Sequence, residues 1–215
     1  MKKTIEISCI AGLALAILLS AAKSAYSFEN TRSAITEGVV RLHIIAESDS
    51  SEDQRLKLLV RDAILEKSSG LFGSGESKQD SLASISESLD EIKLTAKGVL
   101  RENGCGAEVD CKLVRMYFPT RVYKDFTMPP GYYDALRISI GSAQGKNWWC
   151  VMYPPLCIPS ACEITELSEA DGFTEEELEM LTNPEEYEVK FKCVELAEKL
   201  REYFEKRNEE RSEET

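Results

Sequence analysis

The spacing of hydrophobic and polar positions changes several times along this 215-residue chain, and each change predicts a different kind of segment. The run from Ile7 to Leu19 is almost uninterrupted and has no polar face, unlike a helix on the surface of a soluble domain. Lys2 and Lys3 precede the run and small residues follow it, as in secretory signals. The run is shorter than the ~20 residues that a spanning helix usually needs. We therefore predict that residues 1–27 are a signal peptide or, if the small residues lengthen the run, an N-terminal anchor.

The basic residues at the N-terminus also predict the direction of export. Positive charges beside an apolar segment are retained in the cytoplasm, so Lys2 and Lys3 should stay there. The chain after residue 27 is then expected outside the cytoplasm, with the N-terminal segment as its only contact with the membrane. Three candidate cleavage positions have a small residue two places earlier: Ala22, Ser24 and Ser27.

Two helices follow a first strand in the exported part. Residues 39–46 are rich in β-branched and aliphatic side chains, which predicts the strand. Ser50 and Asp53, or Ser51 and Gln54, have the spacing of a capping box, and the apolar stripe that begins there continues to about Lys67. Apolar residues then recur at steps of three and four from Ser81 to Asn103, which predicts a second helix with one buried face.

From about Ala107 the apolar period becomes two, which is the period of half-buried strands. A turn at Pro129-Pro130-Gly131 separates two of these strands, and the last one runs from Trp148 to Tyr153. One strand, two helices and then three or four strands indicate an α+β fold. We expect an antiparallel sheet with two helices packed on one face.

The negative charge of the chain lies in its C-terminal quarter. The formal net charge is -12, and residues 163–215 hold 19 acidic and 7 basic residues, whereas residues 1–162 hold 19 of each. This change in composition predicts a boundary near Cys162. Residues 28–162 would form the α+β domain, and residues 163–215 an acidic helical C-terminal extension. The acidic balance argues against binding to nucleic acid, because phosphate recognition needs a basic surface.

Candidate catalytic chemistry is sparse. His43 is the single histidine, and a catalytic pair with Cys150 remains open. A lone histidine in a strand is more often structural, however. The cysteine spacings do not match the close pairs of a zinc site, and no phosphate-binding glycine loop or nucleophile elbow is present. We therefore expect no catalytic residue, no metal and no cofactor.

Cysteines outside the cytoplasm can form disulfides, and six of the seven follow the N-terminal segment. The best-supported pair is Cys150 with Cys157, because it would hold the intervening Pro-Pro turn. Such a short loop would contribute roughly 2–3 kcal/mol in the chain-entropy model. Two further pairs have weaker support: Cys105–Cys111 and Cys162–Cys193. The alternative is that all six are buried thiols.

Several long blocks resemble one known family. The block Arg41-Leu42-His43-Ile44-Ile45-Ala46-Glu47-Ser48 and its continuation through residue 63 resemble the opening of the stage II sporulation protein R family. Residues 117–123 (Tyr-Phe-Pro-Thr-Arg-Val-Tyr), 130–137 and 145–157 resemble later blocks of that family. The blocks occur in the family's order over roughly residues 39 to 157.

The resemblance implies an exported signalling protein of endospore-forming bacteria. Proteins of this family are made in the forespore and act in the space between the forespore and mother-cell membranes. They activate a membrane-embedded aspartic peptidase that processes the sigma-E precursor. The family supplies no catalytic residues, which agrees with the sparse chemistry above. Two alternatives remain open, namely an exported cell-wall hydrolase of sporulation and a passive structural protein of the spore envelope.

The partner of such a signal would be the peptidase, bound through large aromatic and basic residues, which most often dominate interface energetics. We predict a partner-binding set within the matched blocks: Arg121, Tyr123, Asn147, Trp148, Trp149 and Tyr153. The alternative is that the two tryptophans belong to the core.

Overall fold

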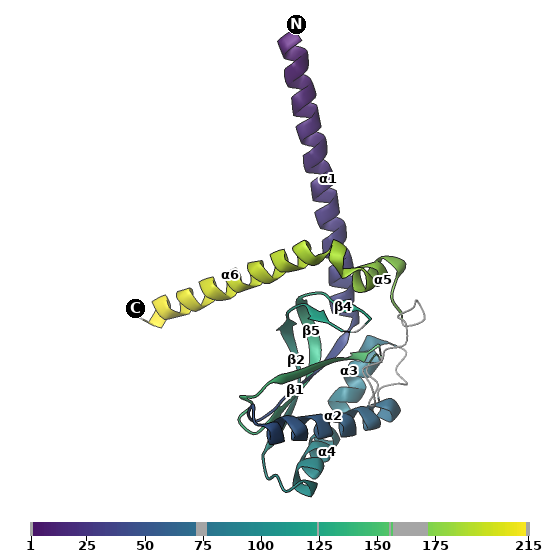
Figure 1. The fold of residues 1–215 in the computed structure, drawn as a ribbon, viewed down its shortest axis with the longest axis vertical. Helices are drawn as coiled ribbons and strands as arrows, with labels where there is room; N and C mark the ends of the chain where they lie inside the picture. The colour runs from purple at the N-terminus through teal and green to yellow at the C-terminus, as the bar shows by residue number, and fades with distance from the viewer. Residues whose placement is uncertain (1, 72–76, 124, 155, 157–171, 214–215) are drawn as a thin grey trace.

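The computed structural model describes residues 2–71, 77–123, 125–154, 156 and 172–213 (Figure 1). Its helices are α1 (Lys2–Gly38), α2 (Ser51–Leu71), α3 (Lys78–Glu87), α4 (Leu89–Glu102), α5 (Glu175–Thr182), the 3-10 helix η2 (Pro184–Glu186) and α6 (Glu188–Glu213). Its strands are β1 (Val40–Ile45), β2 (Val109–Phe118), β3 (Arg121–Val122), β4 (Thr127–Met128), β5 (Gly131–Ile140) and β6 (Asn147–Tyr153). The α+β class expected from the sequence is confirmed.

The sheet differs from the expected antiparallel one in a single ladder. Four strands are ordered β2-β5-β1-β6, and β3 and β4 form a separate two-stranded sheet. The β2–β5 and β1–β6 pairs are antiparallel, but β1 and β5 pair in parallel, from Val40 opposite Asp134 to Ile45 opposite Ser139. The prediction of a purely antiparallel sheet is therefore wrong. The period of two specifies which face of a strand is buried, and it carries no information about strand direction.

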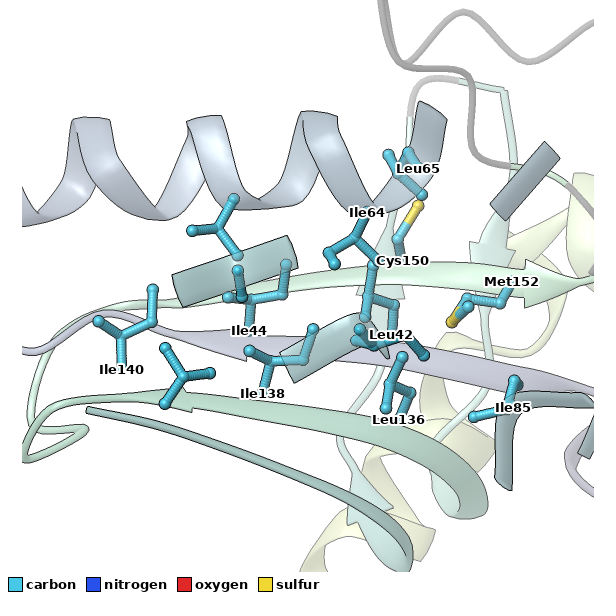
Figure 2. Packing of buried hydrophobic residues seen from close by; sticks show 14 of the residues in the cluster. Leu42, Ile44, Ile64, Leu65, Ile85, Leu136, Ile138, Ile140, Cys150 and Met152 are labelled. Carbon is cyan, nitrogen blue, oxygen red and sulfur yellow. The ribbon is translucent and has the colours of Figure 1, made fainter. Parts of the chain in front are cut away.

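Helices α2 and α4 cover one face of the sheet, as predicted. Figure 2 shows Ile64 of α2 lying above Leu42 of β1, and Leu65 lying above Cys150 of β6. From α4, Ile92, Ala96 and Leu100 enter the same cluster.

The predicted second helix is divided at Ser88, where α3 ends and α4 begins. Ile85 in α3 and Ile92 in α4 are both buried in the core cluster beneath the sheet. The apolar stripe therefore continues across the break, which is why the sequence pattern indicated one helix.

The opposite face of the sheet is covered by the end of α1 and by the C-terminal region. Phe28 and Ile35 of α1 pack there with Phe118, Met128 and Tyr133, and α5 and α6 add further buried residues: Met180, Leu181 and Phe191. The start of α5 is fixed by a capping box between Thr174 and Glu177. The acidic extension thus docks on the domain through apolar residues. The predicted boundary near Cys162 lies outside the described residues.

Helix α1 runs without interruption from the apolar N-terminal segment into the domain (Figure 1). Side chains from Ile5 to Leu19 are exposed, and Phe28 is the first buried residue of the chain as described. Residues Ile5–Gly38 are long and apolar enough to cross a membrane by length and composition, with a mean hydropathy of 2.2 in the most apolar window. The helix is compatible with either a signal or an anchor.

The state of four cysteines tests part of the predicted disulfide pairing. Cys105, Cys111 and Cys193 are free thiols, so the pairs Cys105–Cys111 and Cys162–Cys193 are wrong. Spacing in sequence does not determine the distance between Cβ atoms that a disulfide requires. Cys150 is disulfide-bonded. Cys157 lies outside the described residues, so its pairing with Cys150 stays a prediction.

Candidate functional site

A surface hollow of about 510 Å³ lies between β3 and the start of β6. Seven residues line it: Arg121, Val122, Tyr123, Lys146, Asn147, Trp148 and Trp149. Five of the six residues predicted to bind a partner are therefore brought together, although two segments far apart in sequence supply them. Tyr153 is the exception, because it packs against the main core beneath the sheet.

The two adjacent tryptophans point to opposite faces of β6. Trp148 packs against the core below α2, where the guanidinium of Arg61 lies 4.5 Å from its ring centre. Trp149 lies on the other face, 5.2 Å from Phe118 between ring centres. Both side chains are half-buried, so neither is a fully enclosed core residue. The two tryptophans therefore cover both faces of β6, which is an edge strand of the sheet.

Arg121 covers the exposed side of Trp149. Its guanidinium carbon is 3.5 Å from the centre of the Trp149 ring, the geometry of a cation–π contact. Burial lowers the pKa of Arg121 from its ordinary value, with the neighbouring Arg41 as a smaller cause in the same direction. The guanidinium nevertheless remains charged, because arginine titrates far above neutral pH. The hollow thus presents a fixed cation on an aromatic surface.

A fully buried arginine forms the floor behind this surface. Arg41 donates from Nε to the Cys150 carbonyl at 3.1 Å and from Nη2 to the Tyr123 hydroxyl at 2.7 Å. Its guanidinium lies over the rings of Phe118 and Tyr133, at 4.6 and 5.0 Å. Tyr123 in turn donates to the Trp149 carbonyl at 3.2 Å. These bonds satisfy two carbonyls of the edge strand and hold Tyr123 in place.

His43 fixes the rim of the hollow from the same side of β1. Its Nε2 is 2.8 Å from Asn147 Oδ1, and its ring meets Trp149 edge-on at 5.4 Å. Burial lowers the pKa of His43 below its ordinary value, and this outweighs the opposing effect of the Asn147 hydrogen bond. The neutral imidazole is therefore favoured at pH 7. Its Nε2 then carries the proton and donates to Asn147.

The catalytic pair left open by the sequence is not formed. In the β1–β6 ladder His43 lies opposite Trp149, whereas Leu42 lies opposite Cys150. Neighbouring residues of a strand point to opposite faces, so His43 and Cys150 face different sides of the sheet. His43 acts here as a positioning group for Asn147.

The loop that leads into β6 is tied to the loop after β1. The Lys146 amide donates to Asp49 at 2.7 Å, and the Gly145 amide donates to the Ala46 carbonyl at 2.9 Å. A Cβ atom at Gly145 would lie 2.2 Å from the Ser48 carbonyl oxygen, so only glycine fits this approach. These contacts set the position of Asn147 before the strand begins.

The electrostatics of the hollow favour a ligand rich in acceptors. Arg121 and Lys146 line it, although the chain as a whole is acidic. Among the residues that line it, three buried donors have no hydrogen-bond partner within the described part of the chain: Arg121 Nε, Trp148 Nε1 and Trp149 Nε1. Buried donors without partners are destabilising, so they gain most from carboxylate or carbonyl oxygens.

Sequence reasoning did not select Arg41, His43 or Lys146 for this site. The first two alternate with apolar residues in a strand whose six residues are all buried. A charged side chain in such a strand is rarely buried without partners. An arginine within a strand of apolar residues was therefore the feature of the sequence that could have pointed to Arg41 as a site residue.

Comparison with known proteins places this hollow inside a shared region. A family model described as stage II sporulation protein R matches residues 36–163. The stage II sporulation protein R of Bacillus subtilis (strain 168) is 34% identical over 160 residues, which cover 73% of this chain and 71% of that relative. No solved structure was found to match. All residues that line the hollow fall within the family match, whereas α5 and α6 fall outside it.

Proposed function

Because the chain belongs to the stage II sporulation protein R family, we propose that it is an exported, non-enzymatic signal that activates the membrane aspartic peptidase processing the sigma-E precursor. The observation that carries this proposal is the hollow beside β6. It gathers five of the predicted partner-binding residues in the family-matched region and offers aromatic surface, cations and unpaired donors together.

The N-terminal segment supports the proposed compartment. Helix α1 supports export of the domain, with Lys2 and Lys3 retained on the cytoplasmic side. In a sporulating cell the domain would then occupy the space between the forespore and mother-cell membranes. It would meet the outward-facing segments of the peptidase there.

The proposed ligand is an outward-facing peptidase segment that carries acidic and apolar side chains. Its carboxylates would pair with Arg121 and Lys146, and its apolar groups would pack on Trp149. The residues behind the hollow are already held by hydrogen bonds, notably Tyr123 by Arg41 and Asn147 by His43. Binding to such a preorganised surface loses little side-chain entropy.

Activation requires that the chain bind the active state of the peptidase more tightly than the inactive state. A ligand shifts a conformational equilibrium only by its difference in affinity for the two states. A tenfold preference for the active state corresponds to about 1.4 kcal/mol. One or two contacts of the Arg121 type would supply this difference.

The test is co-expression of the chain with the peptidase and its precursor substrate in a non-sporulating host, with cleavage followed by immunoblot. We expect cleavage that requires the chain and residues 1–27. Arg121→Glu should abolish it, because the reversed charge repels the acidic segment. The matched control is Lys112→Glu on β2, at the opposite edge of the sheet, which should leave cleavage unchanged.

Two results would contradict the proposal. One is the absence of cleavage when all partners are verifiably present, and the other is equal cleavage with Arg121→Glu and with the parent chain. Release of soluble fragments from peptidoglycan by the purified protein would instead support the exported cell-wall hydrolase.

A further inference from the structure

We propose that α6 is a second membrane contact, lying along the lipid surface beside the N-terminal segment. The sequence alone indicated the N-terminal segment as the only membrane contact. This inference goes beyond the signalling role and does not depend on the peptidase. It rests on three features of α6: an exposed apolar stripe, its place beside α1 and the segregation of its charges.

The apolar stripe of α6 is unusually exposed. Leu196 is 59% exposed and Phe204 55% exposed, values that are high for large apolar side chains. The stripe recurs at steps of three and four and so occupies one face of the helix: Val189, Cys193, Leu196, Leu200, Tyr203 and Phe204. A continuous exposed stripe of this kind indicates an interaction surface.

The opposite face of α6 docks on the domain. Phe191 is buried in the core cluster above the sheet. Glu195 accepts a hydrogen bond from the Thr120 amide at 2.8 Å, and Glu198 accepts one from the Tyr132 hydroxyl. These residues are three, four or seven positions apart and share one face, which lies about half a turn from Leu196 and Leu200. The apolar stripe therefore faces away from the domain.

The start of α6 meets α1 where the apolar run of α1 ends. Lys190 Nζ lies 3.4 Å from Ser24 Oγ and 5.4 Å from the centre of the Phe28 ring. Ser24 follows the last small apolar residues, Ala21 and Ala22, by only two positions. Figure 1 shows α1 and α6 leaving the same end of the domain, with α6 running sideways from α1. If α1 stands in a bilayer, α6 lies at the level of its surface.

Basic and acidic side chains of α6 lie on different sides of the apolar stripe, as in helices that lie at a membrane interface. Lys192, Lys199 and Lys206 recur every seven residues and form a row along one border of the stripe. Five glutamates occupy the opposite face, namely Glu195, Glu198, Glu202, Glu205 and Glu209, whereas Glu188 pairs with Lys192 in the lysine row. Lysines beside an apolar stripe reach lipid headgroups while their stems stay on the apolar side. Most of the acidic charge of this helix is thereby turned away from the lipid.

Contact with lipid would keep the domain at the membrane surface by two attachments. Helix α6 has 26 residues and is about 39 Å long, so it would limit tilting of the domain about α1. If the signal is cleaved at Ala22, Ser24 or Ser27, α6 would be the remaining attachment.

The test uses the full chain in vesicles of phosphatidylcholine with a minority of anionic phosphatidylglycerol. An environment-sensitive fluorescent amino acid replaces Leu200 in one protein and Glu202 in its matched control. Both positions are exposed, and they point to opposite sides of α6. Nitroxide-bearing lipids quench a fluorophore in the bilayer surface, and iodide quenches one in water.

We expect the fluorophore at position 200 to be quenched at least severalfold more by nitroxide lipids than the one at position 202, with the reverse order for iodide. Phe204→Glu combined with Leu196→Glu should remove the difference. Equal iodide quenching at both positions would overturn the proposal. Protection of position 200 from iodide without quenching by nitroxide lipid would also overturn it, because the stripe would then be covered by protein, such as a second copy of the chain.

Discussion

The guanidinium of Arg121 lies 3.5 Å from the ring centre of Trp149, and this contact joins the short strand β3 to the edge strand β6. It places a cation and an indole on the same wall of the hollow. Neither residue has a sequence neighbour that could hold the other in place. The stacking therefore depends on the supporting residues behind it, and it defines what single substitutions should do.

Replacing Arg121 by Ala should expose Trp149 while changing stability little. A cation–π contact at a partly exposed site contributes about 0.5–1 kcal/mol, so the loss of unfolding free energy should stay near that value. Quenching of Trp149 fluorescence by acrylamide should rise, measured with Trp148→Phe so that Trp149 is the only tryptophan. Arg121→Lys keeps the cation and should show a smaller rise. Unchanged quenching in Arg121→Ala would mean that the contact does not persist in solution.

Arg41 should be far more important for stability than Arg121. Arg41→Ala leaves the Cys150 carbonyl and the Tyr123 hydroxyl without their charged donor and creates a cavity. We expect a loss of about 3–5 kcal/mol in denaturant unfolding, because two buried oxygens lose a hydrogen bond and a large side chain leaves a cavity. Tyr123→Phe removes one hydroxyl and should lose about 1 kcal/mol. The double variant should lose less than the sum of the two, since both changes break the same bond. Strict additivity would show that Arg41 and Tyr123 are not coupled.

The stability of the domain should depend on pH through His43. Its pKa in the folded protein is lowered from 6.5, chiefly by burial, so the unfolded chain binds the proton more readily. The stabilisation is therefore complete above about pH 6.5 and decreases as the pH falls below that value, until the pH reaches the lower folded pKa. Comparison with His43→Gln by thermal unfolding between pH 7.5 and 5 isolates this contribution. If the difference between the two proteins does not change with pH, the ring is not buried as described.

The end of α1 should be part of the folded domain. Phe28 is 8% exposed and packs with Phe191, whereas Tyr26, two residues earlier, is 70% exposed. Phe28→Ala should therefore lower the unfolding free energy by about 3 kcal/mol or more. Tyr26→Ala is the matched control and should change it by less than about 0.5 kcal/mol. Equal effects would indicate that α1 separates from the domain in solution.

Patterns along the chain were sufficient for most of the local elements, although they did not indicate the break between α3 and α4 at Ser88. The apolar steps of α2 and α4, the period of two in β2 and β5 and the apolar run before residue 27 each depend on residues close in sequence. The same is true of the choice of Trp148, Trp149 and Arg121, which came from their chemical types within blocks that resemble a family. Whether these residues bind a partner is a prediction that the experiments above address.

Only the tertiary structure determined which segments and side chains lie next to one another. It set β1 parallel to β5, turned His43 and Cys150 to opposite faces, left Cys105 and Cys111 unpaired and placed α6 beside α1. The physical reason is that periodicity and composition specify which side of a segment avoids water, but not which other segment covers it. Packing over the whole chain determines which segments cover each other, and for this reason Arg121 lies on Trp149.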